Sequence, residues 1–150
     1  MKMGLMFLAL ILLVSCSSIP EQKTTAGTPQ FKVDPFWPKP LPSNWILGQV
    51  AGIAVDKDAR IWILQRPASL VDDEKGAQLK PPTTRCCTAP PPVLQFDAAG
   101  NLLRSWGGKG AGYDWPENEH GLFVDDDGNV WVGGNSPKDH HLLKFTPDGK

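Results

Sequence analysis

An internal repeat constrains this chain more than any other feature of its sequence. Residues 51–63 align with residues 120–132 at a constant offset of 69, without a gap. Five positions are identical (a Gly, a Val, two Asp and a Trp), and three more exchange one aliphatic residue for another. Residues 93–101 align with residues 142–150 in the same way, at an offset of 49. Such self-similarity indicates a fold built from one repeated supersecondary unit.

Each aligned segment has the pattern of a β-hairpin. Asp-rich turns with Gly supply the positive φ that a tight turn needs, and the flanking aliphatic and aromatic residues suit strands. Two hairpins in series make a four-stranded unit, and such units recurring about every 40–50 residues are typical of propeller blades. No stretch shows sustained helical periodicity, and the 6 Trp, 15 Gly and 15 Pro suit a turn-rich β protein. The sequence therefore predicts an all-β propeller, with about two blades in residues 43–150.

The repeat resembles the NHL repeats of known β-propellers over roughly residues 47–150. A blade buries its faces only against neighbouring blades, and a closed ring takes at least four of them. We therefore expect this chain to be the N-terminal part of a longer propeller, whose further blades follow Lys150.

The two offsets differ, and the difference locates an insertion at about residues 67–92. This Pro-rich segment is expected at one rim of the propeller, where long structured loops are often functional. It contains Cys86 and Cys87. Three alternatives are open for this pair: bonds to cysteines beyond Lys150, which we favour, a vicinal disulfide, or a soft-metal site.

The N-terminus has the features of an export signal. Its apolar run covers residues 4–14, shorter than the roughly 20 residues of a membrane-spanning helix, and suits a signal peptide. Residues 13–16 resemble the lipobox of bacterial lipoproteins, which implies cleavage after residue 15 and lipidation of Cys16; an ordinary secretory signal is the alternative. We thus expect a protein anchored by lipid to a membrane of the bacterial cell envelope.

Residues 16–42 are expected to form a Pro/Thr-rich tether that cannot build a core. The aromatic residues near its end, Phe36 and Trp37, suggest that part of it lies across the globular body as a strap. The net charge is −1, from 15 basic and 16 acidic residues without a basic run, which argues against a nucleic-acid partner.

The repeat also separates architectural residues from surplus ones. The Asp and Trp that recur at 56, 125, 62 and 131 are expected to serve turns and packing. Arg66 aligns with Asn135 and His120 aligns with Ala51, so the repeat explains neither. A guanidinium at a blade end could bind a carboxylate, and an imidazole at an inner-strand start could bind a metal. The alternatives are an exposed arginine at the start of a loop for Arg66, and a surface or core-satisfied histidine for His120. His140 and His141 are expected on one strand, facing opposite sides.

Residues 47–56, Arg66 and residues 120–122 together resemble the start of peptidyl-α-hydroxyglycine α-amidating lyases, which are six-bladed propellers of this repeat type. The resemblance implies that His120 is one of three zinc ligands and that Arg66 binds the substrate carboxylate. It also implies that Val50 and Leu122 offer backbone carbonyls to a structural calcium. The implied activity is metal-dependent cleavage of a carbinolamide to an amide and glyoxylate.

Two classes of function therefore compete. One is a lyase-like enzyme that takes a small-molecule or peptide ligand at the mouth of the propeller channel. The other is a non-catalytic propeller that binds a protein, peptide or glycan at the cell envelope. We expect the 150-residue chain alone to be inactive, because the other zinc ligands and the catalytic base would follow Lys150.

Overall fold

The computed structural model describes residues 27–150, of which Asp34–Lys150 form one compact unit. The expected signal peptide and the lipidation site Cys16 lie outside the described residues. No helix in the described part of the chain is long and apolar enough to cross a bilayer. Its helical content is limited to three single 3-10 turns: η1 (Pro42–Asn44), η2 (Pro67–Ser69) and η3 (Gly76–Gln78).

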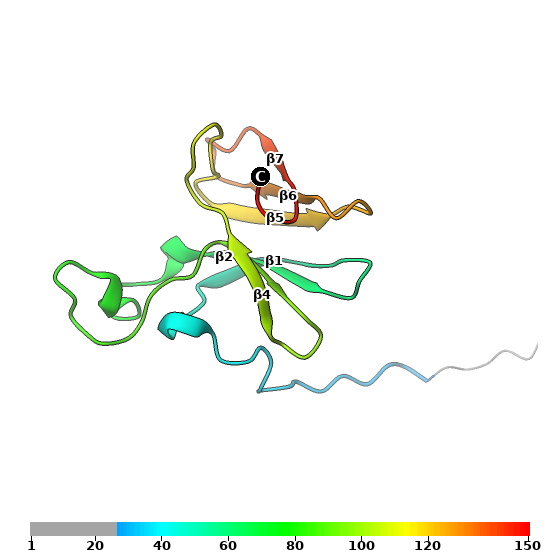
Figure 1. Ribbon diagram of the computed structural model, residues 1–150, viewed down its shortest axis with the longest axis horizontal. Helices are drawn as coiled ribbons and strands as arrows, with labels where there is room; N and C mark the ends of the chain where they lie inside the picture. The colour runs from blue at the N-terminus through cyan, green and yellow to red at the C-terminus, as the bar shows by residue number, and fades with distance from the viewer. Residues whose placement is uncertain (1–26) are drawn as a thin grey trace, which may run out of the picture. The chain divides into compact units, whose positions relative to one another are not determined.

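The unit consists of two antiparallel sheets, which confirms the all-β prediction (Figure 1). The first sheet has the order β1-β2-β3-β4, and the second has the order β5-β6-β7. The first contains β1 (Gln49–Val55), β2 (Ile61–Arg66), β3 (Val93–Phe96) and β4 (Leu102–Trp106). The second contains β5 (Glu119–Val124), β6 (Val130–Gly134) and β7 (Leu142–Phe145). Strands consecutive in the chain are neighbours in each sheet.

The strand register reproduces the sequence repeat position by position. Ala54 pairs with Trp62, and its counterpart Phe123 pairs with Trp131. The β2–β3 ladder likewise matches the β6–β7 ladder, with β2 and β6 related by the offset of 69 and β3 and β7 by the offset of 49. Even the irregularities coincide, because β1 has a bulge between Val50 and Gly52, and β5 has one between residues 119 and 121. The two hairpins therefore share one construction.

The four turns after β1, β3, β5 and β7 are also alike. In each, the first residue of the turn accepts a backbone hydrogen bond from the residue three positions later. That later residue has positive φ at all four sites: Ala59 (56°), Gly100 (84°), Gly128 (84°) and Gly149 (80°). A residue with a Cβ atom is strained at positive φ, so Gly is favoured at this position and Ala59 is the exception.

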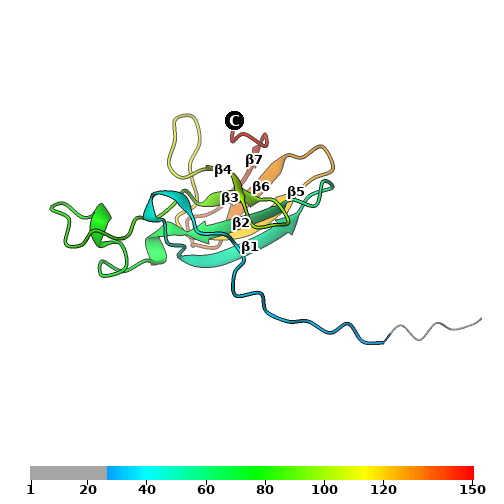
Figure 2. The ribbon, with the colours of Figure 1, turned by 60° about the horizontal axis from the view of Figure 1, so that its bottom comes forward.

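The two sheets stack on a shared apolar layer. One face of the first sheet contributes Trp62, Leu64 and Val93, and the second sheet contributes Val124, Val130, Val132 and Phe145. Gly52 lets the two edge strands β1 and β5 approach closely, since a Cβ there would lie 2.8 Å from the Leu122 Cβ. Figure 2 shows β1 and β5 side by side.

The outer face of the first sheet is covered by the chain that precedes it. Ile63, Leu94 and Phe96 form a second buried cluster, packed against Trp37, Leu41 and Leu47. The Trp37 and Phe96 rings lie 5.5 Å apart, and Lys39 N donates to Gly100 O. We call residues 37–47 the strap. Trp37 lies across the sheet as expected, whereas Phe36 is exposed.

Residues 67–92 leave the sheets between β2 and β3, projecting from the strand ends (green in Figure 2). The corresponding connection in the second sheet is only residues 135–141. The segment returns beside the strap, where Ile46 N donates to Thr88 O and Thr88 N donates to Asn44 O. It is therefore an ordered excursion held by backbone bonds.

Candidate functional site

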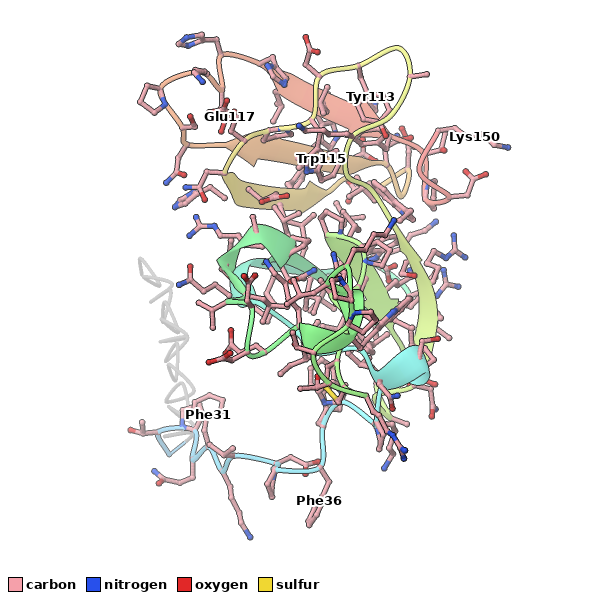
Figure 3. The ribbon with its side chains drawn as sticks, turned by 90° about the vertical axis from the view of Figure 1, so that its left-hand side faces the viewer. Phe31, Phe36, Tyr113, Trp115, Glu117 and Lys150 are labelled. Atoms are coloured by element: carbon pink, nitrogen blue, oxygen red, sulfur yellow. A yellow bond between two sulfur atoms is a disulfide. The ribbon has the colours of Figure 1, made fainter. Side chains whose placement is uncertain are left out.

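A cleft opens where the ends of the two sheets meet the excursion. Its volume is about 550 Å³. The walls come from both ends of the excursion, from the β4–β5 connection and from the start of β5: Pro67, Ala68, Pro92, Gly108, Lys109, Trp115, Pro116, Glu117 and Glu119. We call this the rim cleft. Trp115 and Glu117 lie on the segment that leads into β5 (Figure 3).

Arg66 ends β2 beside the rim cleft and reaches the second sheet. Its Nε donates a 2.6 Å hydrogen bond to the carbonyl oxygen of Glu119, and its Nη1 donates to Gln49 Oε1 at 3.3 Å. Because Glu119 directly precedes His120, two residues from different sheets that the sequence singled out lie near one another. The bonds also give Arg66 a structural role, as a tie between the sheets.

His120 lies at the bulge of β5, as its counterpart Ala51 lies at the bulge of β1. It is exposed. No group of three His, Cys, Asp or Glu side chains among residues 27–150 is arranged to hold a metal. His120 is thus accessible, but it belongs to no three-ligand group among the residues that the structure describes.

Glu119 is a site residue that the sequence argument missed. Only 6% of its surface is exposed, and Oε1 accepts a 2.8 Å hydrogen bond from the Trp115 indole. Its counterpart in the first sheet is Val50, so this acidic side chain is also surplus to the repeat. The comparison that picked out His120 could have found Glu119 one position earlier.

The other charges near the cleft are differently placed. Glu117 forms an ion pair with Lys138 at 2.9 Å, and this hydrogen bond lowers the pKa of Glu117 and raises that of Lys138. Asp139 supports the same wall by accepting hydrogen bonds from the backbone N–H groups of Glu117 and Asn118. Lys109, on the glycine-rich connection, is exposed.

The two residues implied as calcium ligands lie on the neighbouring strands β1 and β5. Val50 pairs with Gln65, and Leu122 pairs with Val132. Calcium takes about six to eight oxygen ligands. These two carbonyls would therefore form only part of such a site.

The recurring acidic residues serve turns and packing, as predicted. Asp56 accepts a hydrogen bond from the Trp62 indole at 2.9 Å, and Asp125 accepts one from the Trp131 indole at 3.0 Å. The bond from Trp131 lowers the pKa of Asp125 well below its usual range. For Asp56, burial acts to raise the pKa, but the hydrogen bonds from Trp62 and the turn backbone outweigh it.

The remaining candidates lie away from the rim cleft lining. The expectation that His140 and His141 share a strand is wrong, since both precede β7, in the loop that Asp139 organises. His141 instead bonds to the carbonyl of Asp114 through Nε2 at 2.6 Å. Cys86 and Cys87 form a disulfide with each other, the vicinal alternative, on the excursion.

No family model and no curated protein matches this chain.

Proposed function

We propose that this protein is an exported, lipid-anchored β-propeller of the NHL type that cleaves a carbinolamide in the manner of the amidating lyases. The observation that carries the proposal is the proximity of Arg66 and His120. The repeat explains neither residue, and the two come from different sheets. The Arg66 side chain donates a hydrogen bond to the backbone carbonyl of Glu119, the residue directly before His120. The repeat does not require either residue type there, since the equivalent positions hold Asn135 and Ala51.

The stacking of the sheets supports further blades. The second sheet has an exposed face, here called the open face, formed by Gly121, Phe123, Trp131, Gly133 and Leu142. Its members are the counterparts of Gly52, Ala54, Trp62, Leu64 and Val93, the face of the first sheet on which the second sheet packs. By the same rule, a third sheet of the repeat would cover the open face.

In the proposed reaction, the C–N bond of a peptidyl-α-hydroxyglycine breaks. The hydroxyl loses its proton and becomes the aldehyde of glyoxylate, while the departing nitrogen gains a proton and becomes the amide. Arg66 would hold the substrate carboxylate, which a planar guanidinium binds well. In the described part of the chain, only Nε and Nη1 have hydrogen bonds, which leaves Nη2 for the substrate.

Residues 27–150 do not by themselves make a zinc site. A catalytic zinc takes about three protein ligands, and these residues bring only one exposed imidazole to the strand start. In this proposal His120 is one ligand of a site completed by further blades. When bound, zinc would supply Lewis acidity toward the substrate hydroxyl. Calcium would likewise need oxygen ligands besides the carbonyls of Val50 and Leu122.

A non-catalytic propeller that binds a protein, peptide or glycan is the second candidate. The observation that favours it is that Arg66 already donates to Glu119 O and Gln49 Oε1. Those bonds give the guanidinium a sufficient structural reason to exist. Under this alternative the channel mouth presents loops, and Arg66 only ties the sheets.

The test measures zinc content and glyoxylate release in the full-length protein. We expect bound zinc in the wild type, a loss of at least half of it in His120→Ala, and no change in the control His140→Ala, which alters another exposed histidine. Arg66→Gln should raise KM for a peptidyl-α-hydroxyglycine. Equal zinc content in wild type and His120→Ala would remove His120 as a ligand. If the zinc-loaded wild type releases no glyoxylate, the lyase activity is excluded and the non-catalytic binding propeller is the remaining candidate.

A further inference from the structure

Glu119 has a buried carboxylate whose presence neither the repeat nor the proposed reaction explains. Its side chain is more than nine-tenths buried. In the described part of the chain its carboxylate has one partner, the neutral indole N–H of Trp115, and no cationic side chain lies within ion-pair distance. Burying a charge without an opposite charge is costly.

The second carboxylate oxygen of Glu119 is not sealed away from solvent. Oε2 has no hydrogen-bond partner in the described residues. It is not among the unpaired polar atoms that are fully buried, so it remains accessible to solvent. Glu119 itself lines the rim cleft, so this largely apolar pocket is where a ligand would meet Oε2. Rings of Trp115, Pro67, Pro92 and Pro116 supply the apolar walls.

We propose that the rim cleft binds a small organic cation with an apolar body, an ammonium or amidinium group that pairs with the Glu119 carboxylate. A few placed polar groups in an apolar cleft are the usual basis of small-molecule recognition. The charged head would provide the missing counter-ion, and its apolar body would lie against the proline and tryptophan rings. This site does not depend on the proposed lyase activity.

Among the other charged groups near the cleft, one carboxylate is already paired, and neither nearby cation, Arg66 or Lys109, pairs with the Glu119 carboxylate. Glu117 is already neutralised by Lys138 and bonded to Ser136, so it has little left to offer a ligand. Lys109 is the one cationic side chain of the lining, and it opposes a cationic ligand. It lies on a connection with positive φ at Gly107 and Gly108, and its long exposed side chain can point to solvent.

The test uses benzamidine, which joins an amidinium to a flat apolar ring, and benzamide as its neutral counterpart. The readout is the indole N–H signal of Trp115 in proton–nitrogen NMR spectra of the full-length protein, assigned with Trp115→Phe. We expect benzamidine to shift this signal saturably and benzamide to bind at least about tenfold more weakly, because only the cation pairs with the carboxylate.

Three variants separate charge recognition from folding. Glu119→Gln retains an acceptor for Trp115 and should lose benzamidine affinity by about tenfold or more. The control Glu74→Gln removes an exposed carboxylate outside the rim cleft lining and should change affinity less than about threefold. Lys109→Ala should tighten binding, and circular dichroism must show each variant folded. The proposal is overturned if benzamidine does not shift the signal, if benzamide binds equally well, or if folded Glu119→Gln binds like the wild type.

Discussion

The ammonium of Lys144 lies 3.4 Å from Asp125 Oδ2, and in the preceding sheet the amide nitrogen of Gln95 lies 3.3 Å from Asp56 Oδ2. Both nitrogens come from equivalent positions of the repeat, and both carboxylates also accept from an indole. The charged version occurs in the second sheet, where Lys144 is exposed. The neutral version occurs in the first sheet, where Gln95 is fully buried. The repeat thus conserves the contact, although the donor changes from a neutral amide to an ammonium.

Asp125→Ala should lower the melting temperature by about 5 °C, because it leaves the Trp131 indole and the turn N–H of Asn129 without their acceptor. Asp125→Asn keeps an acceptor and should lose less. A melting temperature of Asp125→Ala within 1 °C or so of the wild type would contradict the assigned role.

The Asp125 carboxyl group should make the free energy of unfolding depend on pH. Its pKa is lowered in the folded protein, chiefly by the hydrogen bond from Trp131, so its charged form favours folding. That contribution is complete above the unfolded pKa of about 3.9 and declines as the pH falls below it toward the folded pKa. The stability advantage of the wild type over Asp125→Asn should therefore shrink between pH 7 and pH 3. An advantage independent of pH in melting experiments would refute the linkage.

Ala59→Gly should stabilise the protein by about 0.5–1 kcal/mol, since Ala59 has positive φ where the three equivalent turns have Gly. Denaturant unfolding measures the change. Gly128→Ala, at the equivalent turn, is the matched reverse substitution and should destabilise by a similar amount. If both substitutions shift stability in the same direction, the strain at residue 59 is not the cause.

Trp37→Ala should destabilise the unit by about 2 kcal/mol, because it removes the ring that packs on Phe96. Phe36→Ala is the control, as the adjacent aromatic ring is exposed and should contribute close to nothing. Chemical denaturation of both variants compares the neighbours directly. Equal costs would mean that the strap does not pack as described.

Phe123→Lys should reduce self-association of the 150-residue chain, because it places a charge on the open face. Sedimentation velocity over a range of concentrations measures the effect. Phe36→Lys alters an aromatic residue that is exposed elsewhere and should leave association unchanged. A wild-type chain that remains monomeric at high concentration would show that the open face is not adhesive.

The repeat alone predicted the hairpins, their turns and the role of the recurring Asp–Trp pairs, because these depend on contacts within one unit. The sequence did not predict Glu119, whose partner Trp115 lies in an irregular connection where no periodicity exists. It misplaced His140 and His141 for a related reason. Asp139 binds three backbone N–H groups around them, of Glu117, Asn118 and Ser136, and so builds a loop where a longer strand was expected.

The excursion shows the same limit. Its position between β2 and β3 follows from the difference of two offsets. Its return along the strap depends on backbone bonds between Thr88 and residues 44 and 46, which carry no side-chain signature. The favoured pairing of Cys86 and Cys87 with cysteines further along the chain also differs from the bond between them in the structure.

The bulges at Ala51 and His120 have a consequence for how such hairpins can change. Each inserts one residue that has no partner across the ladder, so its side chain can be exchanged without shifting any neighbour out of register. Ala51 and His120 are two different residues at this one unpaired position of the repeat. A functional side chain can therefore replace a small one at the bulge while the strand pairing of the hairpin stays the same.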